Sequence, residues 1–94
     1  MSNVKFTVIE FKSYPYHWNL TREGRKTFDL RLVHPEEGRF RHLKQWLPGD
    51  SDWLIKLVNT ETEEYLYYKI VDVLWEQPAP GWVIIMLGKE IKEE

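Results

Sequence analysis

The sequence contains no cysteine, and it has no apolar run long enough to form a membrane-spanning helix. The first absence excludes disulfide bonds, thiolate nucleophiles and zinc sites built on cysteine. A signal peptide is not indicated either, because no apolar segment of that kind follows the first residues. We therefore expect a cytoplasmic protein with no membrane partner.

Phosphate-binding glycine loops and metal-binding histidine pairs are missing as well. None of the glycine patterns typical of nucleotide-hydrolysing or dinucleotide-binding folds occurs. The histidines, at positions 17, 34 and 42, include no pair four residues apart that could hold a metal ion from one helix face. We predict no metal site and no cofactor.

The composition is that of one globular domain with an uneven distribution of charge. The chain has 94 residues, of which 43% are hydrophobic and 30% charged. This length suffices for one hydrophobic core but not for two. The net charge is −2, yet residues 22–44 carry seven basic and four acidic side chains, whereas residues 45–94 carry four basic and ten acidic. This asymmetry predicts either a locally positive face that attracts phosphate or an ordinary mixed surface.

Five segments have the residue pattern of strands and two have that of short helices. The predicted strands are residues 4–11, 26–33, 53–58, 65–75 and 82–87, and the predicted helices lie within residues 15–24 and 39–47. Proline and glycine mark several of the breaks between them. We predict a single α+β domain over residues 1–94, built on a compact mixed β-barrel of five or six strands, with a frayed tail at residues 88–94.

The predicted strand 26–33 alternates apolar and polar side chains. Its apolar members are Phe28, Leu30 and Leu32, and its polar members are Thr27, Asp29 and Arg31, with Lys26 at its start. Alternate side chains of a strand point to opposite faces, so we predict that the apolar members fill the core. Positions two apart on a strand are separated by about 7 Å, so the polar members could converge on one small ligand or form a solvated ion-pair row.

Residues 24–31, Gly-Arg-Lys-Thr-Phe-Asp-Leu-Arg, resemble the glycine–x–lysine–threonine–x–(acid or threonine)–x–arginine signature of ASCH domains. These are small β-barrel modules of the PUA-like superfamily, and the similarity is closest to a compact ASCH-related group. Phe11-Lys12, Gly49-Asp50 and Gly81-Trp82-Val83 resemble further pieces of the family pattern and occur in the family order. The resemblance covers most of residues 9–87 and implies a barrel of the PUA/ASCH type.

The resemblance also implies a function, because ASCH and PUA-like domains bind RNA or modified nucleosides in a cleft beside this signature. The residues implied to bind the ligand or RNA are Lys12, Trp18, Arg25, Lys26, Thr27, Asp29 and Arg31. The lysines and Arg25 would contact phosphate or a base edge, and Trp18 would stack on a base. Asp29 would accept a hydrogen bond from an exocyclic amine, with Arg31 orienting it.

Two departures from the family pattern bear on catalysis. Ile9 stands where the family has a histidine. One ASCH branch hydrolyses acetylated cytidine with the signature lysine, a threonine and a glutamate, but Asp29 occupies the position of that threonine and cannot replace it in the same mechanism. We therefore expect binding of RNA or a nucleotide-like ligand. The alternatives are a small amidohydrolase acting on a modified nucleoside, with Lys26 catalytic, and a protein-interaction module that uses its acidic C-terminal half.

Overall fold

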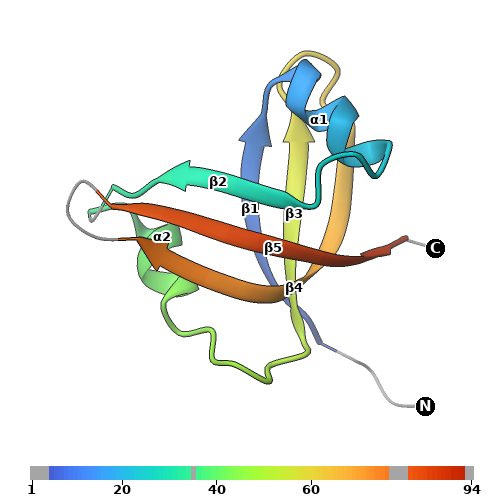
Figure 1. The fold of residues 1–94 in the computed structure, drawn as a ribbon. Helices are drawn as coiled ribbons and strands as arrows, with labels where there is room; N and C mark the ends of the chain where they lie inside the picture. The colour runs from blue at the N-terminus through green and yellow to red at the C-terminus, as the bar shows by residue number, and fades with distance from the viewer. Residues whose placement is uncertain (1–4, 35, 77–80, 93–94) are drawn as a thin grey trace.

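The computed structural model describes residues 5–34, 36–76 and 81–92, which form one curled sheet and two helices (Figure 1). The elements in chain order are β1 (Thr7–Ser13), α1 (Pro15–Arg22), β2 (Phe28–Leu32), α2 (Gly38–Leu43), β3 (Trp53–Asn59), β4 (Tyr65–Glu76) and β5 (Trp82–Ile91). None of the helices in this described part is long and apolar enough to cross a membrane.

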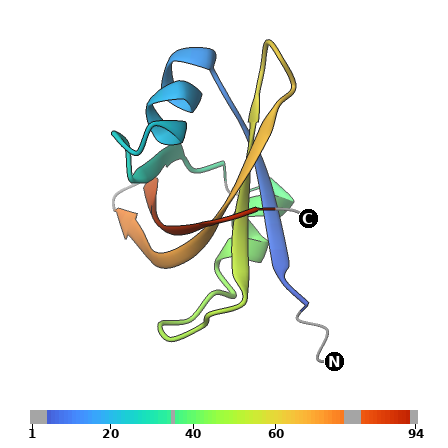
Figure 2. The same cartoon turned by 90° about the vertical axis from the view of Figure 1, so that its right-hand side faces the viewer.

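The sheet has the order β1-β3-β4-β5-β2 and mixes both strand directions. β1 runs parallel to β3, and the other neighbouring pairs are antiparallel. The long strands bend, so that the sheet wraps around its core in the manner of a half-barrel (Figures 1 and 2). The predicted α+β class and the mixed, barrel-like sheet are confirmed, with β1 and β2 as the two edge strands.

Helix α1 begins and ends where local chemistry requires. Pro15 stands at its start, where the missing N–H leaves no partner unsatisfied, and Gly24 follows its end with a φ of +77°. Trp18 is 2% exposed and donates its indole N–H to the Leu57 carbonyl over 3.0 Å. This bond fixes α1 against β3.

The core lies inside the curve of the sheet and is closed by α1 and α2. Phe40 and Leu43 of α2 are buried against the ring of Phe11 and its neighbours. The helical pattern extended to Leu47, but α2 ends at Leu43, and Leu47 is 63% exposed. Trp46 fills that part of the core instead, because the chain leaves the helical path before it reaches Leu47.

The prediction for the two faces of β2 was wrong. Phe28, Leu30 and Leu32 lie on the outer face and are 40%, 45% and 36% exposed, whereas Asp29 is 3% exposed. The reason is the register with β5, which pairs Asp29 with Ile85 and Arg31 with Val83, both of them core residues. An alternating pattern reports two faces, but it does not report which face is inside.

β5 also differs from its prediction in length. It continues to Ile91, which pairs with Tyr67 of β4, so the prediction of a frayed tail over residues 88–94 is wrong for residues 88–91; residues 93–94 lie outside the described residues. Only the inward side chains of Val83 and Ile85 are fully buried, and Trp82 on the outer face is 46% exposed. The long β4 supplies the hydrogen-bonding partner that extends β5.

Tyr68 of β4 links the sheet to α1. It is 8% exposed, and its hydroxyl donates to the Thr21 carbonyl over 3.1 Å. Burial raises the pKa of the Tyr68 phenol above its ordinary value of 10.0, and the carboxylate of Glu90 raises it further. The folded protein therefore holds this proton more tightly than the unfolded chain does.

We expect alkaline pH to destabilise the protein partly through Tyr68. Below about pH 10 the phenol is protonated in both states and its contribution is complete. As the pH rises through the raised pKa of the folded state, the free energy of unfolding falls, since the unfolded phenol ionises first. Urea unfolding at increasing pH measures this loss, which should be smaller in Tyr68→Phe and unchanged in Tyr16→Phe, whose side chain is exposed. Equal alkaline losses in the wild type and Tyr68→Phe would contradict the assignment.

Candidate functional site

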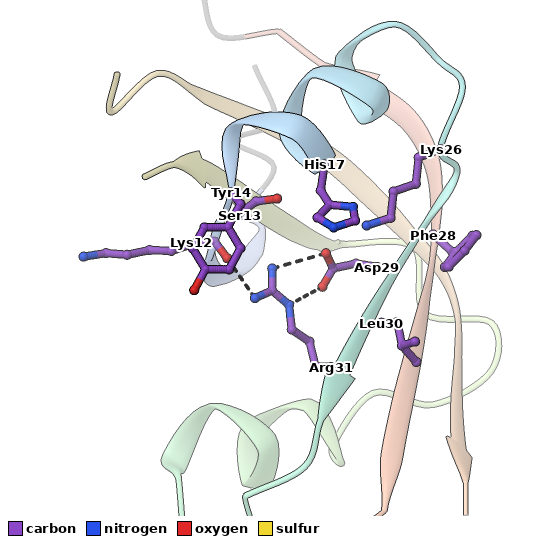
Figure 3. A pocket seen from close by; sticks show the side chains of 9 residues that line it. All are labelled: Lys12, Ser13, Tyr14, His17, Lys26, Phe28, Asp29, Leu30 and Arg31. Carbon is purple, nitrogen blue, oxygen red and sulfur yellow. Dashed lines mark hydrogen bonds and ion pairs between the residues drawn. The ribbon is translucent and has the colours of Figure 1, made fainter. Parts of the chain in front are cut away.

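A pocket of about 400 Å³ opens between the edge strands β1 and β2, beside the first turn of α1 (Figure 3). Its lining residues are Lys12, Ser13, Tyr14, His17, Lys26, Phe28, Asp29, Leu30 and Arg31. Three elements contribute to it: the end of β1, the start of α1, and β2 with Lys26 before it. The pocket therefore lies where the curled sheet comes closest to closing.

Asp29 and Arg31 form an ion pair at the base of the pocket. Arg31 donates from Nε to Oδ2 of Asp29 over 2.5 Å and from Nη2 to Oδ1 over 3.2 Å. The Asp29 side chain is 5% exposed and that of Arg31 23%. A buried carboxylate needs such partners, and the two-pronged guanidinium contact is the strongest that a side chain offers.

The same guanidinium connects the two edges of the sheet. Arg31 donates from Nη1 to the Lys12 carbonyl over 2.8 Å, so a β2 side chain binds a backbone group of β1. The guanidinium carbon also lies 4.7 Å from the centre of the Phe11 ring. Arg31 thus links the two edge strands β1 and β2, and we call this set of bonds the clasp. Arg31 also forms one wall of the pocket.

Lys26 carries the available positive charge of the pocket. It is partly buried, its ammonium lies 5.8 Å from the centre of the Phe28 ring, and within the described residues no carboxylate pairs with it. In Figure 3 the ammonium points into the pocket toward His17, whereas that of Lys12 points away. Because Arg31 already neutralises Asp29, Lys26 leaves the pocket positive on a protein of net charge −2.

The structure brings four of the seven predicted site residues together, Lys12, Lys26, Asp29 and Arg31. Trp18 is buried in the core with its indole bonded to Leu57, so no ring face is open for stacking. Arg25 points elsewhere, into an exposed pair with Glu23 at 3.7 Å. Thr27 is exposed and is not a lining residue; its carbonyl accepts the Leu87 N–H over 2.9 Å.

The sequence reasoning missed the aromatic rings of the pocket, Tyr14 and His17. Tyr14 is 73% exposed and precedes α1, and His17 is exposed in its first turn. Tyr14 at the N-cap and His17 in the first turn both lie at the start of α1, next to the end of β1, and no spacing in the sequence indicated that they share a site. Tyr14 is the N-cap of α1 and precedes the helix proper.

A second group of aromatic and basic side chains lies on the outer face of β3 and β4. Tyr65 and Tyr67 pack edge to face at 5.5 Å, and the Lys56 ammonium lies 4.4 Å from the centre of the Tyr65 ring. Lys56 also pairs with Glu10 at 3.6 Å. These rings are already in contact with one another and with Lys56, so this face is less suited to stacking bases than the pocket is.

No protein-family model matches the chain, and no curated protein matches it significantly. The geometry of the pocket and the sequence signature are the observations from which a function can be argued.

We expect Arg31→Met to cost about 3–5 kcal/mol in the free energy of unfolding, because it leaves the buried Asp29 carboxylate without its partner. Chemical unfolding measures the loss. Asp29→Asn combined with Arg31→Met should recover part of it, since no buried charge then remains. Arg25→Met, which breaks only an exposed pair, should change stability by no more than about 0.5 kcal/mol. An Arg31→Met variant as stable as Arg25→Met would rule out the clasp.

Proposed function

We propose that this chain is an ASCH-like module of the PUA-like superfamily that binds RNA or a nucleotide-like ligand in the pocket between β1 and β2. The observation that carries the proposal is the Lys26 ammonium, which points into a pocket whose carboxylate is already neutralised by Arg31. A phosphate entering the pocket meets positive charge without having to displace an existing ion pair of Lys26. The gathering of Lys26, Asp29 and Arg31 of the signature around one pocket supports the proposal of a binding site there.

The pocket offers complementary groups for each part of a nucleotide. Arg31 uses three N–H groups for Asp29 and Lys12, and a guanidinium has about five, so it retains donors for a phosphate or base oxygen. The exposed ring of Tyr14 can stack on a base, the role first assigned to Trp18. His17 lies beside it, with its ring packed edge to face on Tyr16 at 5.3 Å. A volume of about 400 Å³ falls within the range of small-molecule sites.

The state of Asp29 favours binding over hydrolysis. Both carboxylate oxygens of Asp29 accept hydrogen bonds from Arg31, so Arg31 fixes the orientation of the carboxylate and occupies two of its roughly four lone-pair sites. The Asp29 side chain lines the base of the pocket but is only 5% exposed, so a substrate has little access to it. If the protein were an amidohydrolase, Lys26 would have to catalyse hydrolysis without Asp29 as a general acid or base. We therefore expect no turnover of acetylcytidine, a direct assay for the amidohydrolase alternative.

We expect Lys26→Ala to weaken the binding of short single-stranded RNA or nucleoside monophosphates roughly tenfold, the loss of one charge-assisted contact. For RNA, the plot of log affinity against log salt should become shallower by about 0.7, since one phosphate contact is lost. Calorimetric or anisotropy titrations over a salt series measure both effects.

Lys89→Ala is the matched control, because it removes an exposed lysine of β5 that does not line the pocket. It should bind like the wild type. Equal affinities of Lys26→Ala and Lys89→Ala, or no binding of either probe by the wild type, would refute the proposed function.

A further inference from the structure

The outer face of β4, β5 and β2 presents a regular array of apolar side chains. The strand register sets three rows across these strands: Phe28, Met86 and Asp72; Leu30, Ile84 and Leu74; and Leu32, Trp82 and Glu76. Seven of the nine positions are apolar, and we name these seven the outer patch. Figure 1 shows the three strands side by side at one end of the sheet, with β2 at its edge.

The outer patch has an area comparable with that of the largest apolar patch on a typical monomer, which is often functional. Its most exposed members are Phe28 at 40%, Leu30 at 45%, Leu32 at 36%, Leu74 at 43% and Trp82 at 46%. Large apolar side chains bury roughly 150–250 Å² each, so these exposed fractions amount to about 400 Å² of contiguous apolar surface. A standard interface buries about 800 Å² on each partner, somewhat more than half of it apolar, so the patch matches one side of such an interface.

We propose that the outer patch binds a second copy of this chain, by stacking the two sheets about a two-fold axis parallel to β5. This operation places β2 of one copy on β4 of the other, and β5 on itself. Leu30 then meets Leu74 of the second copy, and Ile84 meets its own counterpart. Such a self-complementary contact is the usual basis of a two-fold dimer, and face-to-face sheets pack about 10 Å apart.

The charges around the outer patch select this axis and this occupant. Both acidic members of the array, Asp72 and Glu76, lie on β4, and β2 contributes none. With the axis parallel to β5, Asp72 of the second copy arrives over Phe28, whose ring lies 5.8 Å from the Lys26 ammonium. With the axis across the strands, β4 would lie on β4, and Asp72 would approach Glu76 of the second copy. The acidic column also repels phosphate, so it disfavours nucleic acid as the occupant.

Sedimentation of the full chain at increasing concentration, up to roughly 1 mM, tests the dimer. We expect the mass to rise from monomer to dimer, and Leu74→Lys to weaken the dimer roughly tenfold or more, because it places a charge in the middle row of the interface. Val8→Lys is the matched control: Val8 is 42% exposed, as Leu74 is 43%, but it lies on β1 outside the patch. Circular dichroism verifies that both variants are folded.

A second pair of variants tests the axis. Asp72→Lys should weaken the dimer because it brings a cation toward Lys26, whereas Asp52→Lys, with the same change of charge at an exposed site outside the array, should not. A monomer at every concentration, or equal dimerisation by Leu74→Lys and Val8→Lys, would overturn the proposal. Equal effects of Asp72→Lys and Asp52→Lys would overturn the axis. Leu74 does not line the pocket, so Leu74→Lys should still bind RNA or nucleotide, and the dimer and the binding function can fail separately.

Discussion

The curled form of this open sheet depends on Arg31, whose guanidinium binds groups on both edge strands. It binds Asp29 on its own strand, β2, and the Lys12 carbonyl on β1. A side chain therefore joins the two edge strands along the seam, the line where a closed barrel would have backbone pairing. Arg39 repeats the device from α2 by donating to the Glu10 carbonyl over 2.9 Å. Both guanidinium groups lie within 5 Å of the centre of the Phe11 ring. Unpaired edge groups of β1 are thereby satisfied by cations that also pack on an aromatic core residue.

This clasp also determines the electrostatics of the pocket. Because Arg31 must neutralise a carboxylate that is 5% exposed, its charge is committed to the fold. A ligand of the proposed kind would therefore encounter Lys26 as the unpaired charge and Arg31 mainly as a source of fixed hydrogen-bond donors. Fixed donors around a mobile ammonium distinguish ligands by geometry as well as by charge, which a surface cluster of lysines does not.

The sequence was sufficient for those features that local chemistry decides. The alternation of apolar and polar residues identifies the strands, and Gly24 identifies the end of α1. Both signals can be read from the sequence because they depend on neighbouring residues alone. The orientation of β2 could not be obtained in this way, since Asp29 is inside only through its pairing with Ile85 and its bond to Arg31. The burial of Trp18 could not be predicted for the same reason. Its position in the helix is compatible with facing either a ligand or the core, and it lies in the core because its indole N–H bonds to the Leu57 carbonyl, 39 residues away in the sequence.

The two surfaces of β2 are connected by the geometry of the strand itself. Side chains alternate with a period of two, so turning Asp29 and Arg31 inward to close the seam turns Phe28, Leu30 and Leu32 outward. An edge strand that served the clasp alone could carry polar residues at those three positions and would be more soluble. Its apolar outer side continues across β5 to Leu74, and contiguous exposed apolar surface of this size is typical of a binding face. The strand that forms one wall of the pocket is therefore also the strand that presents the apolar surface proposed to form the dimer.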